Sequence, residues 1–263
     1  MMLAAFIFLL SSGGCSKTSD PLVPTPARRV NYNLMVKDVL GVTGKATFVE
    51  TSSTETTVTI VLTGAPSGIH PAELCMNSAV EGGTVVLQFN PVDTTGTSIT
   101  TVTSLTYSQL LVYDGFIKVD SSSTNPGVIL VQGDIGGNVI TTTQKSYVLD
   151  TIGAFGVSGT ALFQKRVNGN TLVTLTVTGT IPGDLYPATI NLGSISSVGG
   201  GPVVKGLNDV DGTNGKSLTN IRKLDSDVTI TYDNWLVYDG YINIYQTSVG
   251  LGNIICHGNI GSN

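Results

Sequence analysis

Apolar and polar side chains alternate along two segments of the chain, 56–63 and 171–178. The first reads Thr-Thr-Val-Thr-Ile-Val-Leu-Thr and the second Thr-Leu-Val-Thr-Leu-Thr-Val-Thr, and each is followed by Gly and then a Pro-containing turn. A period of two predicts a strand with one buried face. Four more short strands are predicted, at 84–89, 128–132, 203–207 and 254–256. Helical turns are predicted only for 104–111 and 229–236.

A fifteen-residue segment occurs twice in the sequence, at 105–119 and 230–244, and eight of its positions are identical in the two copies. Three further pairs of segments recur in the same order: 42–48 with 157–163, 70–72 with 186–188, and 132–136 with 257–261. The distance between matched positions grows from 115 to 125, so the second copy carries insertions, chiefly within 218–229. A unit of roughly 110 residues has the size of a domain rather than of a solenoid repeat.

Each copy is expected to hold seven or eight strands separated by turn residues, which is the pattern of a β-sandwich or a small barrel. We place the two domains at 31–145 and 146–263. Abundant Thr, Val and Gly and a charged fraction of only 12% agree with an all-β protein. The net charge of −5 and the absence of a Lys/Arg stripe exclude nucleic acid as an expected partner.

The N-terminal segment 1–14 is expected to be a signal peptide. Its apolar run of about ten residues is too short to span the hydrocarbon core of a bilayer. Small residues and then Cys15 follow, and this order resembles a bacterial lipoprotein signal, in which the Cys is lipidated. A plain secretory signal is the alternative. Segment 15–30 is rich in Pro and has the composition of a tether. The expected location is therefore the outer membrane, on its periplasmic or outer face.

Cys75 and Cys256 remain once Cys15 is assigned to lipid. In an oxidising compartment an even pair invites a disulfide. The two cysteines do not occupy equivalent positions of the repeat, so a bridge would join the two domains, and two buried free thiols are the favoured alternative.

Four segments of the first copy together resemble the CHRD (chordin-type) domain, in the version found in secreted lipoproteins of Bacteroidota. They are His-Pro-Ala-Glu-Leu at 70–74, Glu-Gly-Gly-x-Val at 81–85, the segment from Leu105 to Tyr-Asp-Gly-Phe-Ile at 113–117, and Gln-Gly-Asp-Ile-Gly at 132–136. The resemblance covers about 39–138 and 153–263. It implies two tandem Greek-key β-sandwich domains of Ig-like type, outside the cytoplasm, in a family associated with binding rather than with catalysis.

The same resemblance marks a candidate metal site, because the family commonly carries His-x-x-His-x-His where this chain has His70, Glu73 and Cys75. A later family His corresponds to Asp120 here and to Tyr245 in the second copy. Imidazole, carboxylate and thiolate all bind Zn²⁺, and a thiolate also suits Cu⁺. The favoured alternative is that His70 caps a turn and Cys75 packs in the core.

No nucleophile elbow and no phosphate-binding glycine loop is present in the sequence, so no catalysis is expected. Asp114-Gly115 and Asp239-Gly240 are expected to be two-residue hairpin turns. The aromatic residues in and around the repeated fifteen-residue segment are interpreted chiefly as residues of the hydrophobic core. The sequence thus predicts a lipid-anchored binding or scaffold protein with a protein or glycan partner. A zinc- or copper-binding envelope protein and an accessory subunit of an outer-membrane assembly are the alternatives.

Overall fold

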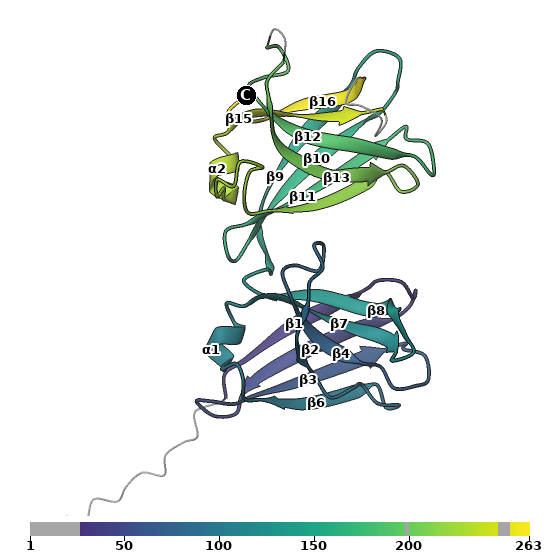
Figure 1. The fold of residues 1–263 in the computed structure, drawn as a ribbon, viewed down its shortest axis with the longest axis vertical. Helices are drawn as coiled ribbons and strands as arrows, with labels where there is room; N and C mark the ends of the chain where they lie inside the picture. The colour runs from purple at the N-terminus through teal and green to yellow at the C-terminus, as the bar shows by residue number, and fades with distance from the viewer. Residues whose placement is uncertain (1–26, 198–199, 247–252) are drawn as a thin grey trace, which may run out of the picture.

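In a computed structural model, the protein is described for residues 27–197, 200–246 and 253–263. The signal segment 1–14 and Cys15, with its expected lipidation, lie outside the described residues. The regular secondary structure of the described residues is almost wholly β, in two sets of eight strands with one short helix each (Figure 1). The predicted all-β class is therefore confirmed.

The first repeat forms one eight-stranded sheet with the strand order β5-β4-β7-β8-β1-β2-β3-β6. Its elements are β1 (Arg29–Val36), β2 (Thr43–Glu50), β3 (Thr56–Thr63), β4 (Ala72–Met76), β5 (Val85–Gln88), β6 (Thr97–Val102), α1 (Tyr107–Leu110), β7 (Asp114–Ser122) and β8 (Asn125–Gly136).

The second repeat forms a closed barrel with the order β10-β11-β14-β13-β12-β15-β16-β9. Its elements are β9 (Ile140–Thr151), β10 (Ser158–Arg166), β11 (Thr171–Thr178), β12 (Leu185–Leu192), β13 (Val203–Asp211), β14 (Lys216–Ile221), α2 (Tyr232–Trp235), β15 (Asp239–Tyr245) and β16 (Ile254–Gly261). The change from one sheet to the next falls between Gly136 and Ile140, so the domain boundary that we placed at 145/146 lies inside β9.

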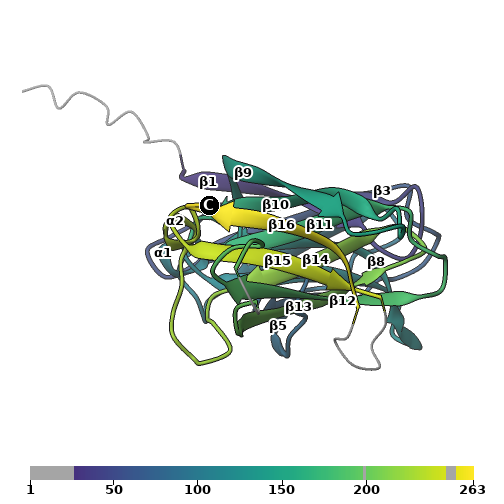
Figure 2. The same ribbon diagram turned by 90° about the horizontal axis from the view of Figure 1, so that it is seen from above.

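Both repeats have the same circular strand order. Strands β9 to β16 correspond in sequence to β1 to β8, and the first sheet is the barrel of the second repeat opened between β5 and β6. The expectation of two separate facing sheets in each repeat is not confirmed, since each repeat holds a single curved sheet. In Figure 1 and Figure 2 the helices α1 and α2 lie at the same end of their repeats.

Pro91 lies at the open seam of the first repeat. In the second repeat Asp209 stands at this position, and β13 continues to Asp211, which pairs with Lys216 of β14. Proline has no N–H to give to a ladder, and Pro91 follows β5, whose last residue is Gln88. Beyond the proline the seam resumes, because the backbone N–H of Asp93 donates to the carbonyl of Thr97 at 3.0 Å.

Side chains bridge the seam in the same way in both repeats. Asn90 donates from Nδ2 to the carbonyl of Ile99 at 2.7 Å, and its backbone N–H donates to Thr100 Oγ1 at 2.8 Å. In the second repeat Asn208 makes the equivalent bonds to Leu218 and Thr219, at 2.6 and 2.9 Å. These asparagines satisfy backbone groups that would otherwise be exposed at a sheet edge.

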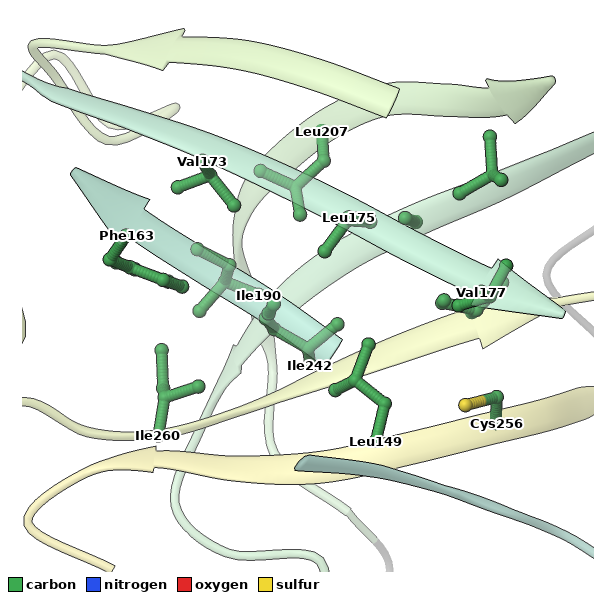
Figure 3. Close-up of a cluster of buried hydrophobic side chains, with 14 of the residues drawn as sticks. Leu149, Phe163, Val173, Leu175, Val177, Ile190, Leu207, Ile242, Cys256 and Ile260 are labelled. Carbon is green, nitrogen blue, oxygen red and sulfur yellow. The ribbon is translucent and has the colours of Figure 1, made fainter. Parts of the chain in front are cut away.

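Each repeat encloses one apolar core. Figure 3 shows the core of the second repeat, where side chains from β9, β10, β11, β12, β13, β15 and β16 converge. Trp235 is fully buried there, with its ring 6.0 Å from Phe163 and 4.9 Å from Tyr238 between centroids. Tyr107 and Tyr232 are also buried, so the interpretation of these aromatic residues as core is confirmed.

Local expectations were met at the helices and wrong at the hairpins. Thr106 and Thr231 each form a capping box, which starts a one-turn helix inside 104–111 and 229–236 as predicted. Asp114-Gly115, however, opens β7 after α1 rather than forming a two-residue hairpin turn, and Gly115 does not have a positive φ. A Cβ at Gly115 would lie 2.7 Å from both the Cys75 carbonyl oxygen and the Tyr113 ring, and this close packing requires the glycine.

A fully buried arginine joins the two repeats. Arg166, at the end of β10, donates from Nη1 to Asp134 Oδ2 of β8 at 2.6 Å and to the carbonyl of Asn138. Asn168, in the turn after β10, donates to Asp114 Oδ1 at 2.8 Å. The Gly-Asp-Ile-Gly segment of the first copy, which recurs as Gly-Asn-Ile-Gly in the second, thus supplies the acid for this junction.

Candidate functional site

His70 lies just before β4 and is 2% exposed. Its Nδ1 lies 2.7 Å from the carbonyl oxygen of Ser121, and its Nε2 lies 2.9 Å from that of Pro66. Its backbone also pairs with Val92. Both ring nitrogens are therefore engaged by backbone carbonyls, and the side chain ties the loop before β4 to the end of β7.

Glu73 and Asp120 share one lysine. Glu73 on β4 pairs in register with Lys118 on β7, and Lys118 Nζ lies 2.8 Å from Glu73 Oε2 and 2.8 Å from Asp120 Oδ2. The side chains are 14%, 18% and 3% exposed for Glu73, Lys118 and Asp120. Ala72 and Leu74 point into the core, so Glu73 lies on the outer face of the sheet.

Burial and ion pairing together shift the pKa values of Asp120 and Lys118. Burial raises the pKa of Asp120, and Lys118 offsets only part of that rise. For Lys118 burial acts to lower the pKa, but hydrogen bonds and charges from Asp120 and Glu73 outweigh it, so the pKa is raised. The lysine therefore carries its positive charge at neutral pH and takes the position between the carboxylates that a metal ion would need.

Cys75 lies on the same face of β4 as Glu73 but is fully buried. Burial raises the pKa of its thiol to about 11, against a partial opposing effect of Lys118. Metal binding uses the thiolate, which this environment disfavours. Across the described ranges no group of three His, Cys, Asp or Glu side chains is placed to hold a metal ion. The structure thus does not bring His70, Glu73 and Cys75 together as a ligand set.

Cys75 and Cys256 are both free and buried, in different repeats. The favoured expectation of two buried free thiols is therefore confirmed. Cys256 lies in the core of the second barrel, and burial raises the pKa of its thiol to about 12.

A pocket of about 430 Å³ opens beside the charged cluster of the first repeat. Glu73 and Asp120 line it, and its other walls are mainly apolar: Ile69, Pro71, Phe89, Pro91 and Pro126 contribute to them. The volume is within the usual range for small-ligand sites. Asp120 Oδ1 is buried and has no hydrogen-bond partner among the described residues. Apolar walls beside an incompletely satisfied charged group are typical of a binding site.

The second repeat replaces this cluster by neutral side chains. Thr189 and Asn243 stand in the same register pair as Glu73 and Lys118, and Tyr245 stands at the position of Asp120. Thr189 Oγ1 donates to Asn191 Oδ1 at 2.7 Å, and Asn243 Nδ2 donates to the Tyr245 hydroxyl at 3.3 Å. The two repeats therefore keep the same backbone but differ in charge at this face.

A larger pocket of about 580 Å³ lies between the repeats. Its lining is mostly apolar, and Asp134 is its one charged residue among those described. Both carboxylate oxygens of Asp134 are engaged, Oδ2 by Arg166 and Oδ1 by the backbone N–H of Ala79 at 2.7 Å. The larger pocket therefore offers a ligand no unpaired charged oxygen among the described residues, and we take the smaller pocket as the candidate site.

Sequence reasoning named Glu73, Cys75 and Asp120 but missed Lys118, which decides what this cluster does. The sequence difference that marks Lys118 was present in the repeated fifteen-residue segment, where Lys118 aligns with Asn243. A charged residue in one copy and a neutral one in the other marks a position that the fold itself does not require.

Comparisons with family models, with curated proteins and with solved structures gave no match to this chain. Within the residues that the structure describes, no helix is long and apolar enough to cross a membrane.

Proposed function

We propose that this protein is a non-catalytic binding protein of the cell envelope, built from two CHRD-like repeats and held at the outer membrane by a lipid on Cys15. The first repeat is the binding module. The second repeat is a rigid support that sets the distance and orientation of the first.

The observation that carries this proposal is the difference between the repeats at one face. The first repeat has a pocket of about 430 Å³ beside a largely buried charged cluster, whereas the second has neutral side chains bonded to one another at the same positions. Burying charges without a function costs stability, and the second repeat shows that the fold does not need them.

The junction between the repeats supports the role of the second repeat. Arg166 and Asn168 connect it to β8 and to the start of β7 through side-chain bonds to Asp134 and Asp114. The segment before β1 has the composition of a tether, which would let a lipid-anchored protein reach partners near the membrane surface.

The metal-binding alternative has less support, because Lys118 stands between the carboxylates and both His70 nitrogens are engaged. Metal content by mass spectrometry on chelator-free protein decides it. One equivalent of zinc or copper that is lost in Cys75→Ser would restore this alternative. The accessory-subunit alternative predicts a stable membrane complex that copurifies with the native protein.

Ligand-induced stabilisation tests the binding function. Thermal unfolding is measured with a panel of amines, sugars, carboxylates and short peptides, since a ligand of the folded state raises the Tm. We expect at least one class to stabilise the wild type and to lose this effect in Glu73→Gln. Asp209→Asn, an equal charge change at an exposed site of the second repeat, is the matched control. The proposal is refuted if no class of compound raises the Tm of the wild type, or if the same compounds raise the Tm of Glu73→Gln equally.

The anchor is tested separately. Cells grown with an alkyne-tagged fatty acid should label the wild type and not Cys15→Ser, and the variant should leave the membrane fraction. Labelling that persists in Cys15→Ser would refute the anchor without affecting the assignment of the pocket.

A further inference from the structure

We infer that the pocket of the first repeat binds an organic monocation, an ammonium or guanidinium group on an apolar stem, which donates to the free oxygen of Asp120. This inference rests on the proposed binding function and specifies its ligand class.

The charge of the pocket calls for a cation. Glu73 and Asp120 contribute −1 each and Lys118 contributes +1, which leaves −1. The lining residues include no Lys, Arg or His. A ligand with a single positive charge would therefore neutralise the cluster, whereas an anion would add to its negative charge.

The hydrogen-bond inventory points to the same class. Lys118 engages Asp120 Oδ2, while Asp120 Oδ1 is without a partner among the described residues. The Asp120 side chain is 97% buried, as the complement of its 3% exposure. A buried carboxylate oxygen needs a donor, and an N–H of a cation makes a stronger bond to it than a neutral donor does. Both ammonium and guanidinium groups supply such donors.

The walls favour an organic ion over a metal ion. Three prolines, Ile69 and Phe89 present carbon surface around the carboxylates. Ca²⁺ and Mg²⁺ require many oxygen ligands, and Zn²⁺ usually has four protein or water ligands, which apolar walls do not supply. An alkyl stem, in contrast, gains from contact with such walls.

The second repeat acts as an internal control. The equivalent positions hold the neutral side chains Thr189, Asn243 and Tyr245. Tyr245 stands where the first repeat has Asp120, the carboxylate that we propose accepts from the ligand. A cation should therefore bind to the first repeat alone.

Titration of the ¹⁵N-labelled full chain with n-butylammonium and n-butylguanidinium, followed by NMR, tests this inference. We expect saturable shifts in β4, β7 and the loop at 88–91, and none in β12 and β15. The neutral probe n-butanol should bind at least tenfold more weakly. Asp120→Asn should lose at least tenfold in affinity for the cations, and Asp209→Asn should lose none. Circular dichroism of Asp120→Asn verifies its fold, and Glu73→Gln, which removes the same unit of charge, provides a second variant.

Two sources can supply this chemistry, a free amine or a side chain of a partner protein. Tighter binding of Ala-Lys-Ala or Ala-Arg-Ala amides than of the matching alkyl cation assigns the site to a partner side chain, and weaker binding assigns it to a free amine. Equal affinities for n-butanol and n-butylammonium, or unchanged affinity in both variants, would overturn the inference. If the cations fail to bind while another class of compound raises the Tm of the wild type and not of Glu73→Gln, only this inference is refuted, and the proposed binding function stands.

Discussion

Replacing Asp134 by Asn should destabilise the protein by leaving the charge of Arg166 buried without a counter-ion. Arg166 is 0% exposed and Asp134 is 16% exposed, with 2.6 Å between Nη1 and Oδ2. Removing one partner of a buried ion pair typically costs 3–5 kcal/mol, and the partial exposure of Asp134 favours about 3 kcal/mol. For a chain of this size that loss lowers the Tm by roughly 6–12 °C.

The chain itself shows that Asn fits this position. Asn259 stands at the position of Asp134 in the second repeat, and its Oδ1 accepts from the backbone N–H of Ile195 at 2.9 Å. Asp134 Oδ1 accepts in the same way from Ala79 at 2.7 Å. The substitution therefore keeps the loop hydrogen bond, and it removes both the charge and the oxygen that accepts from Arg166 Nη1.

Urea unfolding followed by circular dichroism gives the free energy of unfolding, and the fluorescence of Trp235, the one tryptophan of the sequence, reports the second repeat. The double variant Asp134→Asn/Arg166→Met should recover about 2 kcal/mol or more relative to Asp134→Asn. Nε and Nη2 of Arg166 lack partners among the described residues, which makes its neutral replacement easier. A loss below about 1 kcal/mol for Asp134→Asn, or no recovery in the double variant, would refute the assignment of the buried ion pair as the stabilising contact between the repeats.

Three further predictions concern titration and local structure. Because burial raises the pKa of Asp120 in the folded protein, its proton stabilises the fold at low pH and this contribution is lost as the pH rises above about 4. Urea titrations should therefore show Asp120→Asn gaining stability relative to the wild type with rising pH, and a constant difference would contradict this. With Cys15 replaced, Cys75 and Cys256 should resist iodoacetamide at pH 8 and both should react once the chain is unfolded, because burial raises the pKa of each thiol. Mass spectrometry counts the adducts, and rapid labelling of the folded protein would contradict this prediction. Thr106→Ala and Thr231→Ala should each cost about 1 kcal/mol by loss of a capping box, measured by urea unfolding, and Thr→Ser at each site is the control that keeps the cap.

Much of the fold follows from local sequence pattern. The strands at Thr56–Thr63 and Thr171–Thr178 were predicted with their observed bounds, because a period of two and a following glycine are properties of neighbouring residues. The two helical turns were predicted in the same way, at the short polar-rich segments 104–111 and 229–236. The repeat also identified equivalent positions, although it did not show which of them carry charge for a reason.

The hairpin prediction was wrong because distant residues decide the conformation, and for the same reason the sequence left the candidate metal site open. Asp114-Gly115 has the composition of a hairpin turn, but the approach of the Cys75 carbonyl and the Tyr113 ring makes it the packed start of a strand. His70, Glu73 and Cys75 have the spacing of a ligand set. The register between β4 and β7 places Lys118 beside Glu73 instead, and loop carbonyls engage His70.

The sequence by itself determined the all-β class, the tandem repeat, the positions of six strands and the candidate side chains Glu73 and Asp120. Only the tertiary structure decided that the strands form a closed barrel in one repeat and an open sheet in the other, that Lys118 lies between the two acids, and that Arg166 joins the repeats through Asp134. The physical reason is that strand propensity and turn chemistry act over a few neighbours. Sheet register, ion pairing and burial depend on residues that are far apart in the chain.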